Sequence, residues 1–113
     1  MSRAWNRGGS VLERGKGPPP CLKILGEHDP KYGNLFSQLF ELTFSPGALD
    51  AKTKLLIAMA VNANTGVGYG CSEIAKILKG MKVKKEEITE ALRVAATVGA
   101  IRGVVTGAEA YKE

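Results

Sequence analysis

Residues 50–79 constrain this chain most, because an unusually apolar helical segment leads through glycines directly into a second helical segment. Residues 55–61 read LLIAMAV and are apolar on every helical face, which is typical of a helix buried on all sides. Gly66, Gly68 and Gly70 then break the helical pattern. The stretch therefore predicts two packed helices joined by a tight glycine turn.

The glycine turn is followed by a cysteine, Cys71, and we expect the second helix to begin at Cys71-Ser72-Glu73, with Ser72 as its cap. A thiol in the first turn would be favoured as the thiolate by unpaired N–H groups and the helix dipole. A free cysteine can equally be an inert, small hydrophobic group. Lys76 would favour the thiolate from one turn away, and Tyr69 offers a hydroxyl. The candidate catalytic residues are therefore Cys71, Lys76 and Tyr69.

Helical periodicity extends over the rest of the chain and predicts an all-α fold. Asp29 and Pro30 mark the start of a helix that Pro46 ends. The apolar residues between them recur at steps of three and four, which places them on one face. Residues 50–64 form the next helix, and a further one begins near Glu86.

The C-terminal segment carries glycines at a four-residue spacing, at Gly99, Gly103 and Gly107. On a helix they would form a smooth stripe that lets another helix approach closely. The alternative is three ordinary helix breaks. The apolar helix 50–64 also needs more cover than a chain of 113 residues can supply. Both features predict a homo-oligomer that assembles through helix 50–64 and the glycine stripe.

The net charge of +5 is concentrated at the N-terminus, where residues 1–20 hold four basic residues and one acidic residue. Glycines and prolines predict that residues 1–20 are a flexible basic arm whose last three residues, Pro18-Pro19-Pro20, form an extended spacer. Residues 21–113 are then a single domain. No motif of interleaved aromatic and basic residues accompanies the arm, so a nucleic-acid partner is not expected.

The ligating residues are too few for a conventional zinc site within one chain, since there are two cysteines and one histidine. We expect no metal and no cofactor. Cys21 and Cys71 are predicted to be free thiols in a reducing compartment. No apolar run approaches the roughly 18 residues of a membrane span, and no secretory signal is evident. These observations predict a cytoplasmic protein with no membrane partner.

Three stretches of the chain resemble the carboxymuconolactone decarboxylase and alkylhydroperoxidase D superfamily over roughly residues 29–111. They are PGALDAKTKLLIAMAV, the turn Gly-Tyr-Gly-Cys, and VKKEEITEALRVAATVGA. The resemblance implies an all-α helical bundle whose chains assemble as trimers or hexamers, with functional sites near the subunit contacts.

The resemblance also locates the redox motif of the peroxidase branch, Cys-x-x-Cys-x-x-x-His, which works with a glutamate on the preceding helix. Its second cysteine corresponds to Cys71, whereas its first corresponds to Gly68. The histidine corresponds to Ala75, or to Ile74 if the gap is placed otherwise, and the glutamate to Leu55. The histidine of the decarboxylase branch is missing as well, so decarboxylase activity is not expected.

Two functions of different class therefore remain open. In the first, the protein is a thiol-dependent peroxidase of peroxiredoxin type, and Cys71 is resolved by an external thiol or by Cys21 of a neighbouring arm. In the second, it is a catalytically inactive oligomer that binds a small ligand or acts as a scaffold, and Cys71 is buried.

Overall fold

The computed structural model describes residues 20–113, and these form helices without any strand. The elements are α2 (Pro20–His28), α3 (Pro30–Phe44), α4 (Ala51–Thr65), α5 (Gly68–Gly80), α6 (Lys85–Gly107) and the short 3-10 helix η2 (Ala108–Tyr111). The predicted all-α fold is confirmed. Residues 1–19 of the arm predicted for residues 1–20 lie outside the described residues.

Two helices begin where their aspartate caps predict. The Tyr32 N–H donates to Asp29 Oδ1 over 3.2 Å at the start of α3. The Thr53 N–H donates to Asp50 Oδ1 over 2.8 Å at the start of α4. Hydrogen bonds from Thr53 also hold the pKa of Asp50 below its ordinary value. Each carboxylate satisfies an N–H group that the helix itself leaves unpaired.

The helix α2 is a departure from expectation, since Pro20 opens a helix instead of ending an extended spacer. Proline is well suited to the first helical position, where no N–H is needed. A helix of this length depends on tertiary packing. That packing comes from α3: Leu22 is buried, and a Cβ on Gly33 would lie 2.8 Å from the Gly26 Cα.

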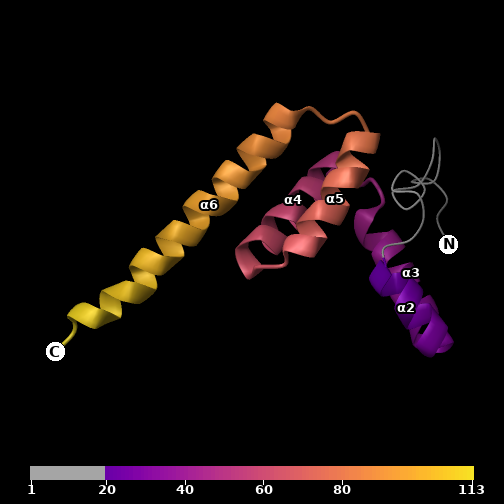
Figure 1. Ribbon diagram of the computed structural model, residues 1–113, viewed down its shortest axis with the longest axis horizontal. Coiled ribbons are helices and arrows are strands. Elements are labelled where there is room, and N and C mark those ends of the chain that lie inside the picture. The colour runs from indigo at the N-terminus through magenta and orange to yellow at the C-terminus, as the bar shows by residue number, and fades with distance from the viewer. Residues whose placement is uncertain (1–19) are drawn as a thin grey trace.

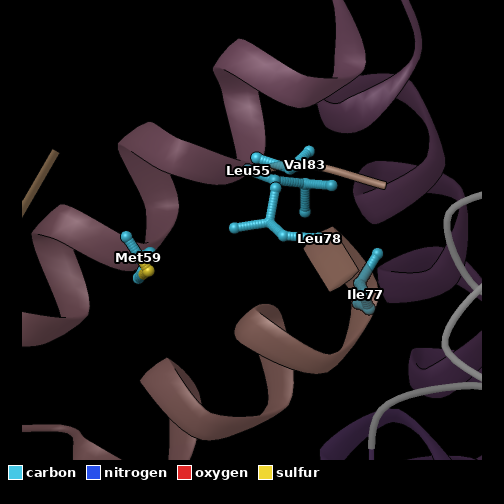
Figure 2. Packing of buried hydrophobic residues seen from close by; sticks show 5 residues of the cluster. All are labelled: Leu55, Met59, Ile77, Leu78 and Val83. Carbon is cyan, nitrogen blue, oxygen red and sulfur yellow. The ribbon is translucent and has the colours of Figure 1, made fainter. Parts of the chain in front are cut away.

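The main core lies where α4 packs on α5. Leu55 and Met59 of α4 face Ile77 and Leu78 of α5, and Val83 closes the cluster from the connection to α6 (Figure 2). Figure 1 shows α4 and α5 side by side, with the long α6 running beyond them towards the C-terminus. Because α4 also packs against α6, it is the element that the other helices share.

A single chain does not bury α4 on every side, because Ile57 and Val61 are 49% and 56% exposed. The radius of gyration is 16.7 Å, against about 13 Å for a compact domain of this length. The helices therefore form an open arrangement, and one face of α4 has no cover from residues 20–113.

At its N-terminus, α6 is held to α4 by an ion pair in which Lys52 Nζ donates to Glu87 Oε1 over 2.8 Å. The second carboxylate oxygen accepts from the Lys84 N–H over 3.0 Å, which caps α6. The hydrogen bond from Lys52, with the one from Lys84, lowers the pKa of Glu87. Glu86 and Glu87 lie in the first helical turn, as the sequence predicts.

Gly99 and Gly103 lie inside α6, so the alternative that they break the helix is wrong for these two, whereas Gly107 is the last residue of α6. A Cβ on Gly99 would lie 2.6 Å from Asn64 Oδ1, so this glycine serves the contact with α4. Gly103 and Gly107 have open space around them. Within the described chain, Lys85–Tyr111 is the one segment long and apolar enough, by length and composition, to cross a membrane.

We expect Leu78→Ala to destabilise the fold strongly, because Leu78 is fully buried between α4 and α5. Truncating such a leucine lowers the free energy of unfolding by about 2–5 kcal/mol. The matched control is Leu42→Ala on α3, where the side chain is 73% exposed and the change should be about 0.5 kcal/mol or less. Urea unfolding followed by circular dichroism measures both, and equal losses would contradict the assigned core.

Candidate functional site

The turn between α4 and α5 is built by backbone geometry. Gly66 caps α4 in the left-handed region, at φ 79°, and the Val67 N–H donates to the Asn62 carbonyl oxygen over 2.8 Å. The helix α5 then begins at Gly68, three residues before the predicted start. The predicted cap at Ser72 is therefore wrong, because this residue lies inside the helix and no side chain caps it.

Cys71 is the fourth residue of α5, and not the first as the sequence predicted. Its own N–H donates to the Val67 carbonyl oxygen over 3.2 Å, so it is not one of the unpaired donors of a helix start. The half-buried thiol packs against the core cluster, with Sγ 3.5 Å from the Met59 carbonyl oxygen. In that contact the thiol acts as the donor and the carbonyl oxygen as the acceptor.

Lys76 is paired with Glu73, and no hydrogen bond joins it to the cysteine. Lys76 Nζ lies 2.9 Å from Glu73 Oε2, and this hydrogen bond and charge raise the pKa of Lys76. Tyr69 adds a smaller contribution to the same shift. Tyr69, Glu73 and Lys76 follow at steps of four and three, which places them on one side of α5. The structure therefore groups Lys76 and Tyr69 around Glu73 and sets Cys71 apart, against the core.

The position that the resemblance gives to a relay glutamate is Leu55, which is buried in the core beneath Cys71. The histidine position, Ala75, carries no titratable group. Among residues 20–113, the hydrogen bonds give the Cys71 thiol only the Met59 carbonyl as a partner. In the same part of the chain, no group of three or more metal-binding side chains lies together.

A groove of about 530 Å³ opens beside the core, on the neighbouring side of α5, and Phe44 and Ile74 both line it and pack against the core cluster. Its walls come from α2, α3, α4, the glycine turn and α5, and they are mostly apolar. The lining residues are Cys21, Phe40, Phe44, Ala58, Val61, Asn62, Val67, Tyr69, Gly70, Glu73 and Ile74. Sequence reasoning missed this groove because α2, which closes one edge, was not expected. Of the three predicted site residues, only Tyr69 lines it.

Gly70 allows the close approach of α4 and α5 where Asn62 lines the groove. A Cβ at this position would lie 2.5 Å from Asn62 Nδ2, so only glycine lets the amide lie against α5. Within the described residues, the Asn62 side chain makes no hydrogen bond of its own. The groove thus combines an apolar surface with three polar groups: the Asn62 amide, the Tyr69 hydroxyl and the Glu73 carboxylate. In the sequence, Gly70 was the one signal of this groove, because a glycine leaves room for the Asn62 side chain beside it.

The fold and this site define an all-helical protein in which a helix, a glycine turn and a second helix present one cysteine. The model of the carboxymuconolactone decarboxylase family matches residues 30–113. The chain belongs to the carboxymuconolactone decarboxylase family. Comparisons with curated proteins and with solved structures give no match.

We expect the two thiols to differ in reactivity, because Cys21 is exposed on the groove whereas Cys71 is half-buried and hydrogen-bonded. In the native protein, a bulky maleimide should modify Cys21 rapidly and Cys71 only slowly. After denaturation both should react alike, since the difference comes from the fold. Peptide mass spectrometry over a time course measures both rates. Rapid modification of Cys71 in the native protein would contradict its assignment as a packing residue.

Proposed function

We propose that this member of the carboxymuconolactone decarboxylase family binds a small apolar ligand and does not catalyse a reaction. The observation that carries the proposal is the groove between α2, α3, α4 and α5. Its volume of about 530 Å³ lies within the range of small-molecule sites. Its apolar walls and few polar groups have the composition typical of such sites.

The surroundings of Cys71 support a role without catalysis. A nucleophilic thiol needs a neighbouring base or a cation that favours the thiolate. Here Leu55 and Met59 pack beneath Cys71, and Lys76 is bound to Glu73. Of the family's redox positions, Leu55 and Cys71 thus contribute to core packing in this chain. The apolar groove lies on the neighbouring side of α5.

A thiol-dependent peroxidase is the second candidate, and it is favoured by the partial exposure of Cys71 and by the presence of two free thiols. In that reaction the Cys71 thiolate attacks a peroxide oxygen, which gives the sulfenic acid and releases an alcohol or water. An external thiol, or Cys21 of a neighbouring chain, then forms a disulfide and releases water. A second external thiol then releases Cys71 from the mixed disulfide as the external disulfide, whereas a Cys71–Cys21 disulfide consumes two external thiols. Rapid native reactivity of Cys71 would favour this candidate.

We further propose that the protein works as a cytoplasmic homo-oligomer, with copies of the chain covering α4 and α6. The exposed apolar residues of α6 form a continuous surface: Val94, Val98, Ile101, Val104 and Val105. A membrane is the competing cover for α6, but Arg93 and Arg102 lie within the segment and would be costly in lipid. Helix 50–64 and the glycine stripe are the proposed contacts, with Gly103 and Gly107 as the open part of the stripe, because Gly99 lies against α4 of its own chain.

We expect Ala58→Phe to remove ligand binding, because Ala58 lines the groove and a phenyl ring would fill it. The neutral fluorophore N-phenyl-1-naphthylamine reports binding through its increased emission in apolar surroundings. Affinity should fall about tenfold or more in the variant. The matched control is Ala63→Phe, at an exposed position of α4 outside the groove. Binding that is absent in the wild type, or equal in both variants, would contradict the proposed function.

We expect Gly103→Leu to dissociate the oligomer while leaving the single chain folded. Nothing lies within 4 Å of a Cβ at this position, so the chain itself can accept a side chain. A leucine would separate two helices that meet along the glycine stripe. Light scattering gives the mass and circular dichroism gives the helix content. An oligomer mass equal to that of the wild type would refute the role of the stripe. If the protein is recovered only in lipid vesicles, a membrane is favoured as the cover of α6.

A further inference from the structure

The charges at the groove are asymmetric, and this asymmetry defines the kind of ligand that fits. Among the residues of the described part of the chain that line the groove, Glu73 is the one with a charged side chain. Its partner Lys76 lies outside the lining, with a side chain 69% exposed, while the Glu73 side chain is 27% exposed. The carboxylate therefore lies at the apolar surface and the ammonium group lies in solvent.

We propose that the groove binds an amphiphile with a protonated amine at one end, and that Glu73 holds the amine. This proposal rests on the proposed ligand-binding function and names the chemistry of its ligand. Lys76 bonds only to Oε2 of Glu73, so within residues 20–113 no hydrogen bond occupies Oε1. An ammonium group of a ligand can donate to this oxygen, and such charge-assisted hydrogen bonds are stronger than neutral ones.

The ion pair with Lys76 is not an obstacle to this interaction. Ion pairs between exposed side chains contribute little to stability, because water screens both charges. The Lys76 side chain can turn into solvent, where it keeps its hydration, when a ligand ammonium approaches the carboxylate. An anionic ligand would instead bring like charges together at Glu73, and a neutral ligand would lose the charge-assisted bond.

The remaining polar groups suit the same ligand. The Tyr69 hydroxyl and the Asn62 amide oxygen can each accept a hydrogen bond from an ammonium group, which has three donors. The alkyl part would lie against Phe40, Phe44 and Ile74, which line the apolar portion of the groove. Burial of this alkyl surface supplies affinity, and the polar end supplies selectivity.

The test uses three probes with the same alkyl chain and different heads: octylamine, octanol and octanoate. Cys21 lines the groove, so a bound probe should slow its alkylation by N-ethylmaleimide in the full-length protein. Peptide mass spectrometry follows Cys21 separately from Cys71, and the probe concentration that halves the rate gives the affinity. At neutral pH we expect octylamine to bind about tenfold more tightly than octanol, and octanoate to bind weakest.

Two variants assign this preference to the carboxylate. Glu73→Gln should reduce octylamine binding to the level of octanol, whereas Lys76→Gln should strengthen it, because the carboxylate loses its competitor. Glu90→Gln on α6, outside the groove, is the matched control and should change nothing. Circular dichroism confirms that each variant is folded.

The outcomes separate the two proposals. If all three probes protect Cys21 equally, the amine preference is overturned and the groove remains a ligand site. If octanoate binds most tightly, the amine preference is overturned in favour of an anion held by Lys76. If no probe protects Cys21 and N-phenyl-1-naphthylamine also fails to bind, the ligand-binding function itself is overturned together with the amine preference.

Discussion

The packing of α4 on α5 is the contact on which the rest of the structure depends. Leu55 and Met59 interlock with Ile77 and Leu78, and the glycine turn brings the two helices close enough for this packing. The same α4 carries α6 on another side and forms part of the groove wall. Since α4 takes part in all of these contacts, a loss of the α4–α5 core would remove the frame for both the thiol and the groove.

That core also determines the chemical surroundings of the cysteine that follows the glycine turn. In a redox site of this kind, polar and titratable groups would surround the cysteine, and the helix start would favour its thiolate. Here α5 begins early enough to pair the Cys71 N–H within the helix, and the core residue Met59 offers a carbonyl to the thiol. A packing role of Cys71 and an open groove on the neighbouring side of α5 thus have one common cause, the apolar character of α4.

The open shape of the chain has a physical explanation in its composition. Seven hydrophobic residues of the described chain are buried, whereas many large apolar side chains on α3, α4 and α6 are exposed. Exposed apolar surface on this scale marks an interaction surface in a folded protein. Our proposal of further copies of the chain as the cover follows from this, because α4 exposes Ile57 and Val61 and α6 exposes apolar residues from Leu92 to Val105.

The sequence by itself determined α3 and α4 with their starts, because Asp29 and Asp50 satisfy local N–H groups and the apolar periodicity is a local pattern. It did not reveal α2, whose stability comes from contact with α3, nor the early start of α5, which has no side-chain cap. The candidate residues Cys71, Lys76 and Tyr69 came from the sequence, but the rotation of α5 against α4 decides that Cys71 packs on the core, Tyr69 lines the groove and Lys76 lies in solvent. The groove joins residues from four helices, and only tertiary packing brings such distant positions together.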